Sequence, residues 1–126
     1  PWLWVVTDNH QRPLRVRWAW VFNVPRYALG LKFLPDARAD DGLLDLGTFR
    51  DGRFFKGLVY FLGVLSGRHR YWSDWHSERA QRIEIRSDGP VPYQIDGDPG
   101  GELPLTIEVL PGRLTIIGPA KPNAPA

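Results

Sequence analysis

One acidic segment, DDGLLD at residues 40 to 45, has residue types that could do chemistry, since it holds three carboxylates within six residues. Asp40 and Asp41 precede Gly42, and a third carboxylate, Asp45, follows three residues later. A hairpin turn needs one Asp-Gly pair and no further acid. The segment is therefore either a turn with surplus acids or a site that uses these carboxylates for a purpose beyond the turn.

A second acidic segment, QIDGDPGG at residues 94 to 101, repeats the Asp-Gly pair as Asp96 and Gly97 and adds Asp98. Taken alone, it is most simply a hairpin with glycine-rich turn chemistry. Asp98 adds an acid that the turn does not require. We expect the following Pro-Gly-Gly, residues 99 to 101, to hold the loop wide so that a substrate can approach the backbone.

The composition is that of a globular chain without cysteine chemistry. Of the 126 residues, 43% are hydrophobic and 24% are charged, which fits one folded domain. No cysteine is present, which excludes disulfides and thiolate metal sites and favours a reducing compartment such as the cytoplasm. The longest apolar run, residues 58 to 65, is far shorter than the roughly 20 residues that span a bilayer. Because no signal-peptide pattern precedes the first strand-like run, we expect a piece of a longer protein.

Positive charge is concentrated near the start of the chain, although the net charge is only +2. Residues 12 to 32 contain five basic residues and no acid. They form either a solvated sheet face or a surface that meets anionic lipid headgroups or phosphates. Binding to nucleic acid is disfavoured, because no motif of a DNA- or RNA-binding fold is present.

Alternation of apolar and polar residues predicts that most of the chain is β-structure. The pattern is typical of strands in residues 2 to 6, 14 to 22, 28 to 34, 43 to 49, 81 to 86, 91 to 95, 103 to 109 and 114 to 117. One helix is predicted over residues 54 to 65, capped by Asp51 and ended by Gly67. These elements predict a mainly β fold, an antiparallel β-sandwich with one helix, whose core includes Trp18 and Trp20.

Two segments are given no regular structure. Residues 68 to 79 are polar and aromatic, and their His69 and His76 lack the spacing of a helical metal pair. We interpret both histidines as surface or packing residues. The Pro-rich residues 121 to 126 are predicted to be a loose tail that follows a single domain over residues 1 to 120.

Several motifs, taken in order, resemble the C-terminal domain of the lipid kinase family that includes diacylglycerol kinases, sphingosine kinases and bacterial YegS-like proteins. The motifs are Asn23-Val24-Pro25, Gly30, the run from Pro35 to Asp45, Gly67-Arg68-His69, Asp96-Gly97-Asp98 and Pro111-Gly112. They extend over residues 14 to 118, and the DDGLLD block is the most specific of them. The resemblance implies a β-sandwich of the NAD kinase/diacylglycerol kinase-like fold, packed against a separate nucleotide-binding domain.

The resemblance also implies a Mg²⁺ site at the first acidic segment. One carboxylate and two backbone carbonyls would bind the ion, and the matching positions are the Asp41 side chain and the carbonyls of Arg38 and Leu43. Asp40 or Asp45 would support this site from outside the ligand set or cap the turn. Such an ion would be structural and regulatory, and a second Mg²⁺ would arrive with ATP.

The second acidic segment matches the family's Asp-Gly-Glu turn, whose third position carries the proposed general base. That position is Asp98 here, and it would take the proton from a lipid hydroxyl as the hydroxyl attacks the γ-phosphate of ATP. Asp is one methylene shorter than Glu, and a misplacement of about 1 Å can lower a rate by about 10²-fold. Asp96 would orient the loop or assist the metal.

The resemblance further implies partners that this chain lacks. Neither a Gly-Gly-Asp-Gly-Thr signature nor a Walker A pattern for ATP is present, so the chain alone would be inactive. Its partners would be the nucleotide-binding domain, a lipid acceptor such as diacylglycerol, and a membrane surface contacted by Arg15, Arg17 and residues 54 to 65. A homodimer is a further option. The protein would be cytoplasmic and peripheral to the membrane.

Two other hypotheses stay open from the sequence. The first is a stand-alone β-sandwich that binds carbohydrate or protein through an exposed platform of Trp2, Trp4, Trp18 and Trp20. The second is a degenerate kinase domain that serves as a regulatory subunit, for which the Asp at position 98 is the support.

Overall fold

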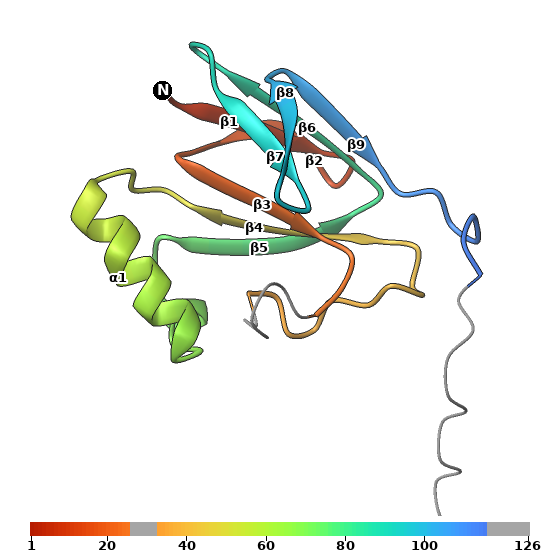
Figure 1. The fold of residues 1–126 in the computed structure, drawn as a ribbon, viewed down its shortest axis with the longest axis horizontal. Helices are drawn as coiled ribbons and strands as arrows, with labels where there is room; N and C mark the ends of the chain where they lie inside the picture. Colours follow the sequence, from red (N-terminus) through yellow and green to blue (C-terminus); the bar gives the residue numbers. More distant parts are fainter. Residues whose placement is uncertain (26–32, 116–126) are drawn as a thin grey trace, which may run out of the picture.

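Two antiparallel sheets form the body of the domain, as the sequence predicts (Figure 1). The computed structural model of the chain describes residues 1 to 25 and 33 to 115. Sheet A has the strand order β2-β1-β6-β9, from β1 (Leu3–Thr7), β2 (His10–Val16), β6 (Arg82–Ser87) and β9 (Leu105–Glu108). Sheet B has the order β3-β4-β5, from β3 (Trp18–Phe22), β4 (Leu44–Phe49) and β5 (Trp75–Ala80). A separate hairpin pairs β7 (Pro92–Ile95) with β8 (Asp98–Glu102).

The apolar core lies between the inner faces of the two sheets. Its buried side chains are Leu3, Val5, Val16, Ile83 and Ile85 from sheet A, and Leu44, Leu46 and Ala80 from sheet B. Leu46 and Ile83 have no exposed surface. Complete burial of such a side chain contributes about 1.5–3 kcal/mol, so this core stabilises the sandwich on which the outer surfaces depend.

The alternating run over residues 14 to 22 forms two strands in different sheets, and not the single strand predicted. Between them lies Arg17, whose N–H donates a hydrogen bond to the carbonyl of Phe49 at 2.9 Å. The crossing shifts the alternation by one residue, so that Ala19 and Val21 pack on the core after it. The prediction that Trp18 and Trp20 pack in the sandwich core is therefore wrong, since both lie on the outer face of sheet B.

The helix α1 (Phe54–Leu65) has the predicted bounds. Its end is a Schellman motif, in which Gly67 has a φ of 69° and the N–H of Arg68 donates to the carbonyl of Gly63 at 2.9 Å. The prediction that Asp51 caps its start is wrong. The N-cap is Arg53, and Asp51 lies two residues earlier, where its Oδ1 accepts the Arg53 N–H at 3.0 Å.

Two strands have no apolar alternation in the sequence, and the prediction missed both. Strand β5 lies within the stretch that was assigned no regular structure. Strand β8 contains the Pro-Gly-Gly of residues 99 to 101, so the prediction of a wide loop there is wrong. A Cβ at Gly100 would lie 2.3 Å from a ring atom of Tyr93, which shows how closely the hairpin packs.

Part of the expected structure lies outside the described residues. This holds for residues 28 to 32 of one predicted strand, including Gly30, and for the tail from residue 116. Residues 114 and 115 belong to no strand. Over the described ranges, the structure has no helix with the length and apolar character needed to cross a membrane.

Candidate functional site

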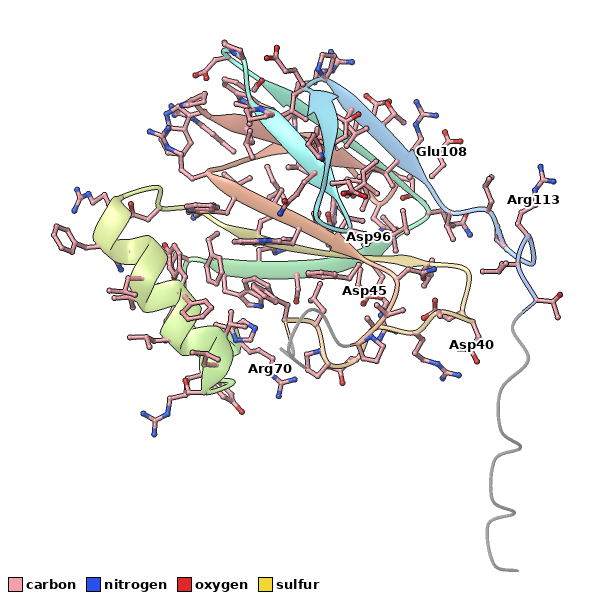
Figure 2. The ribbon with its side chains drawn as sticks, in the orientation of Figure 1. Asp40, Asp45, Arg70, Asp96, Glu108 and Arg113 are labelled. Atoms are coloured by element: carbon pink, nitrogen blue, oxygen red, sulfur yellow. The ribbon has the colours of Figure 1, made fainter. Side chains whose placement is uncertain are left out.

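The outer face of sheet B carries most of the residues of interest. Residues directly opposite each other in neighbouring strands share a face. Around β4, the pairs that define this face are Phe49 with Trp18 and Trp75, Gly47 with Trp20 and Ser77, and Asp45 with Phe22 and Arg79. The face therefore has an aromatic half around Phe49 and a charged half around Asp45, which is labelled in Figure 2.

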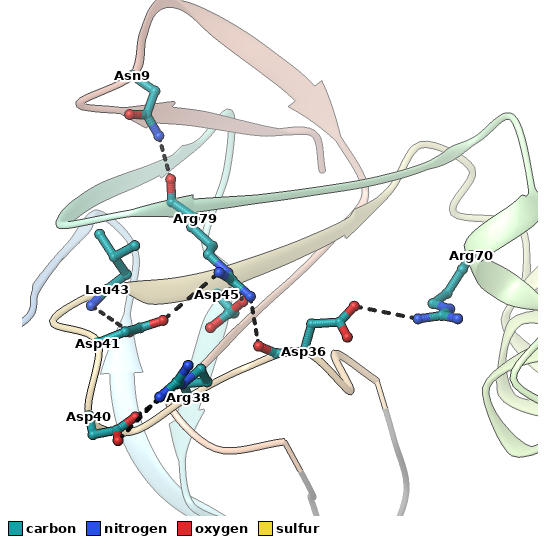
Figure 3. Close-up of polar contacts among 9 residues, drawn as sticks. All are labelled: Asn9, Asp36, Arg38, Asp40, Asp41, Leu43, Asp45, Arg70 and Arg79. Carbon is teal, nitrogen blue, oxygen red and sulfur yellow. Dashed lines mark hydrogen bonds and ion pairs between the residues drawn. The ribbon is translucent and has the colours of Figure 1, made fainter.

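The charged half centres on Arg79, which bridges two carboxylates (Figure 3). Its Nε donates to Oδ1 of Asp45 at 3.2 Å, and its Nη1 lies 4.0 Å from Oδ2 of Asp41. Its Nη2 donates to the backbone carbonyl of Asp36 at 2.7 Å. Asp45 is only 4% exposed, so this single guanidinium faces two carboxylates that are largely withdrawn from water. We call Asp41, Asp45 and Arg79 the carboxylate cluster.

Two oxygen atoms of this cluster lack a hydrogen bond. The Leu43 N–H donates to Oδ1 of Asp41 at 3.0 Å, which is the hydrogen bond of an Asx turn. Oδ2 of Asp41 and Oδ2 of Asp45 are buried, and neither accepts a hydrogen bond from the described part of the chain. A buried polar atom without a partner costs free energy. Two such carboxylate oxygens fit a hard cation, which prefers oxygen ligands.

Electrostatics at Asp45 agree with a shortage of positive charge. Burial raises the pKa of its carboxyl above the ordinary value of 3.8, and the nearby Asp41 raises the pKa further. The hydrogen bond from Arg79 lowers the pKa but does not reverse the shift. The cluster therefore favours either a proton or an additional cation.

Asp40 points away from the cluster. Its side chain is exposed and pairs with the side chain of Arg38, whose Nε lies 3.2 Å from Oδ1 of Asp40. In residues 1 to 25 and 33 to 115, no three His, Cys, Asp or Glu side chains are grouped as a metal site. One carboxylate with two carbonyls is a different kind of site, so the ligand role of Asp41 and of the carbonyls of Arg38 and Leu43 stays a prediction.

The second acidic segment forms a tight two-residue turn. Asp96 has a φ of 51° and Gly97 a φ of 98°, and the flanking Ile95 and Asp98 are paired. These angles are those of a type I′ turn, which fully explains the Asp-Gly pair. Asp96 and Asp98 are exposed, so a solvent-accessible proton acceptor at Asp98 is compatible with the geometry. The role of Asp98 as general base, with support from Asp96, stays a prediction.

The aromatic half of the outer face is covered by α1. Between the helix and the sheet is a cavity of about 190 Å³, lined by Trp18, Trp20, Phe33, Phe49, Gly57, Tyr60, Phe61 and Val64. Phe49 stacks on Tyr60 with 3.9 Å between ring centroids, which fixes the helix to the sheet. Aromatic and aliphatic walls of this kind suit a hydrocarbon chain. We call this space the apolar cavity.

His69 is buried, and its interpretation as a packing residue is confirmed. It has no exposed surface, and its ring nitrogens lie 2.9 Å from the carbonyl oxygen of Phe33 and 3.3 Å from that of Gly63. A Cβ at Gly63 would lie 2.2 Å from the ring of Trp72, which explains the glycine within the helix. His76 is partly exposed beside Glu78, with 3.8 Å between Nε2 and Oε2.

A second cavity, also of about 190 Å³, adjoins the carboxylate cluster. Its lining residues are Leu34, Pro35, Asp36, Asp45, Arg70, Trp75, Ser77, Glu78 and Arg79. At its rim, Nη1 of Arg70 lies 3.5 Å from the Asp36 carboxylate (Figure 3). We call this space the polar cavity, since charged groups and a serine form much of its wall.

The four tryptophans of the platform hypothesis do not share a surface. Trp2 and Trp4 belong to the sheet A side, where the guanidiniums of Arg15 and Arg17 lie 3.9 Å and 4.0 Å from the Trp2 ring centroid. Trp18 and Trp20 stack on the outer face of sheet B with 5.7 Å between their centroids. These two outer faces are on opposite sides of the sandwich, which removes the structural basis of a common platform.

Arg79 is the residue that sequence reasoning missed. It belongs to no motif, and it lies in β5, which was not predicted. The one available indication was a period of two in residues 75 to 80, where an aromatic, a serine and the arginine alternate with other residues. Its partner Asp45 becomes a neighbour only through cross-strand pairing, and Asp41 reaches it from the turn before β4.

Comparison with known proteins identifies the class. Residues 3–118 match the family model of the YegS C-terminal NAD kinase beta sandwich-like domain, so the chain belongs to this family. Diacylglycerol kinases from two strains of Mycobacterium tuberculosis are 30% identical to it over 97 residues. These 97 residues are 77% of this chain and 31% of each relative, so the chain spans about a third of their length.

Solved structures show the same fold. The crystal structure of a diacylglycerol kinase from Bacillus anthracis str. Sterne superposes with a TM-score of 0.66 at 21% identity, over 88% of this chain and 38% of that one. Another structure from the same organism gives a TM-score of 0.69 at 22% identity, over 88% of this chain and 36% of that one. The chain thus has the β-sandwich fold of the YegS C-terminal domain family, as the sequence motifs imply.

Proposed function

We propose that this chain is the lipid-binding domain of an ATP-dependent kinase that phosphorylates the hydroxyl of a diacylglycerol-like lipid. Membership of the YegS C-terminal family and the similarity to proteins named diacylglycerol kinases support the class of reaction. ATP would be bound by a nucleotide-binding domain elsewhere in the parent protein, and the isolated chain would be inactive. The parent would work in the cytoplasm at the membrane surface.

The observation that carries the proposal is the division of one sheet face into an apolar and a charged half. A lipid with a free hydroxyl has the same division, because a hydrocarbon tail is joined to a small polar head. The apolar cavity would hold part of a tail against Trp18, Trp20 and Phe49. The polar cavity and the carboxylate cluster, on the same face, would then lie toward the head.

The first acidic segment would hold Mg²⁺, through Asp41 with the carbonyls of Arg38 and Leu43. The two buried oxygens without hydrogen bonds, on Asp41 and Asp45, are the support for this assignment. When bound, the ion would supply the positive charge that the cluster lacks and hold the acidic turn in one conformation. Arg79 would keep Asp45 oriented through the Nε hydrogen bond at 3.2 Å.

The chemical step would need one proton acceptor from this chain. An oxygen of the Asp98 carboxylate would accept the proton of the lipid hydroxyl while the hydroxyl oxygen bonds to the γ-phosphorus of ATP and ADP leaves. Its exposure at the start of β8 keeps the carboxylate accessible to substrate. Asp96, in the turn, would fix the position of the hairpin end.

Filling the apolar cavity tests the proposal directly. Gly57 lines this cavity, and a Cβ there would lie 3.7 Å from Trp18, which is an ordinary contact. Gly57→Ala is therefore the matched control for Gly57→Leu, whose side chain would occupy the space. Both substitutions favour the helix, so neither should impair folding.

The readout is the change in the total tryptophan fluorescence of the chain, whose Trp18 and Trp20 line the cavity, during titration with dioctanoylglycerol. We expect saturable binding by the unaltered chain and the alanine variant, and a loss of at least about tenfold in affinity for the leucine variant, since about two methylenes would lose their burial. Equal affinity of all three proteins, or no saturable binding by any of them, would contradict lipid binding in this cavity.

A further inference from the structure

The surface of α1 that faces away from the sheet is apolar along its length. Its exposed large side chains are Phe55, Leu58, Val59, Phe61, Leu62 and Leu65, which we call the outer face of α1. Positions 55, 58, 59 and 62 have the spacing of a single helix face. Leu58 and Leu62 are 56% and 54% exposed, and Phe55 is 80% exposed. Adjacent apolar side chains at this exposure indicate a surface that contacts something other than water.

Basic residues lie within and on both sides of α1 along the chain. Residues 50 to 72 contain five basic residues and one acid, Asp51. The basic residues are Arg50, Arg53, Lys56, Arg68 and Arg70, and all five are exposed. Of these five residues, only Arg70 forms an ion pair within the described part of the chain, and its partner is Asp36 at 3.5 Å. In Figure 2 the helix lies at the edge of the domain, and Arg70 lies beside its end.

We propose that the outer face of α1 docks on an anionic lipid bilayer, with its apolar side chains at the boundary of the acyl region and the flanking cations among the headgroups. A bilayer with anionic lipids offers apolar depth and negative charge together. Tyr71, 82% exposed just beyond the helix, is an aromatic of the type found at the headgroup level. A second copy of this chain fits less well, because its identical cations would face these.

The inference rests on the proposed lipid-kinase function and adds a route by which a lipid tail would pass from the bilayer into the apolar cavity. Phe61 is 49% exposed on the outer face and also lines the cavity. A docked helix would thus place the cavity entrance against the lipid phase, so that a tail could enter without crossing water. The docking surface and the cavity are still separate sites, and each can be altered alone.

Vesicle co-sedimentation of the chain tests the docking surface. The vesicles are phosphatidylcholine alone, or phosphatidylcholine mixed with phosphatidylserine. We expect binding to the mixed vesicles, with much weaker binding to the neutral ones. Leu58→Gln/Leu62→Gln should lose most of this binding. The matched control, Leu110→Gln/Leu114→Gln, removes two leucines that are 62% and 79% exposed elsewhere, and it should bind as the unaltered chain does.

The charge component has its own variant pair. Arg53→Gln/Lys56→Gln should weaken binding to the mixed vesicles by at least about tenfold, since each cation near an anionic surface accounts for about fivefold. Arg12→Gln/Arg113→Gln makes the same change in net charge away from α1 and should have little effect. Circular dichroism and urea midpoints verify that each variant is folded.

Three results would overturn the inference: no binding to mixed vesicles, equal binding to neutral and mixed vesicles, or equal losses in a variant and its matched control. Ultracentrifugation supplies a further test, because a dimer that Leu58→Gln/Leu62→Gln dissociates would assign the face to a second copy. Gly57→Leu separates the two proposals. It should leave vesicle binding intact, so docking and lipid capture can fail independently.

Discussion

The two acidic turns of this domain share an Asp-Gly pair but differ in their physical environment. In the carboxylate cluster, Asp45 is 4% exposed, and one arginine serves two acids. In the hairpin, Asp96 and Asp98 are exposed, and the Asp-Gly pair is fully explained by the type I′ turn. The first turn holds more negative charge than its surroundings neutralise, and the second holds free carboxylates.

The two acidic segments look alike in the sequence, but their different burial suits them to different roles. A buried carboxylate with a raised pKa and an oxygen without a hydrogen bond would gain stability from a bound cation. An exposed carboxylate on a rigid hairpin can meet a substrate and exchange protons with it. Four experiments, ordered by the size of the expected effect, test whether the roles divide in this way.

The largest effect is expected at the hairpin, on catalysis. In the full-length kinase proposed above, Asp98→Asn should lower kcat by at least about 10²-fold, because general base catalysis is worth about 10²–10⁴-fold. The measurement is the rate of lipid phosphorylation. Asp96→Asn is the matched control and should change the rate little, since Asn tolerates a positive φ. Equal effects of the two substitutions would remove the distinction between a base and a turn residue.

The next effect is on stability, at the cluster. Arg79→Met removes the guanidinium from two carboxylates, one of them buried, and should lower the free energy of unfolding by about 2–3 kcal/mol. The loss is smaller than for a fully buried ion pair because Arg79 is partly exposed. Urea denaturation in EDTA measures it. Arg82 also pairs with two carboxylates, those of Glu84 and Glu108, but on an exposed surface. Arg82→Met should cause no measurable change, and a loss as large as that of Arg79→Met would contradict the comparison.

A smaller effect is expected from Mg²⁺. At about ten times its dissociation constant, the ion should raise the free energy of unfolding by about 1.4 kcal/mol, because it binds the folded chain alone. Asp41→Asn should abolish this gain, whereas Asp98→Asn, which alters the hairpin, should retain it. Thermal unfolding with and without the ion gives the result. Retention of the gain in the Asp41 variant would place the ion elsewhere.

The smallest effect is a pH dependence from Asp45, measured in EDTA. Because the folded-state pKa is raised, the folded chain retains a proton at Asp45 where the unfolded chain has released it. Stability from this group therefore falls as pH rises from about 3.8 through the folded pKa. Relative to Asp45→Asn, the unaltered protein should be most stable at low pH and lose this advantage on titration. A difference that grows with rising pH would contradict the raised pKa.

Prediction from the sequence was most accurate where a residue pattern has a single physical meaning. The helix over residues 54 to 65 is terminated by the following Gly67, because the left-handed conformation at that position favours glycine. Strands with one buried face, such as that with Ile83 and Ile85, follow from alternation alone. The ordered motifs around DDGLLD led to the family, which is shown over residues 3–118.

Prediction failed where contacts formed only in the folded domain decide which side chains a strand carries and which sheet it joins. Strand β5 was missed because its outer face carries Trp75, Ser77 and Arg79 beside a helix and a charged cluster, so no apolar alternation marks it. The run over residues 14 to 22 was assigned to one strand, because alternation alone does not reveal that a chain changes sheets at Arg17.

The sequence by itself determined the class of this domain, the α-helix α1 and the two acidic segments, since these depend on local conformation and on ordered motifs. Only the tertiary structure decided that Arg79 faces Asp41 and Asp45, that a cavity lies under α1, and that the two acidic turns differ in burial. Strand pairing joins residues far apart in the chain, and burial sets the strength of their charges, so neither property can be read from local sequence.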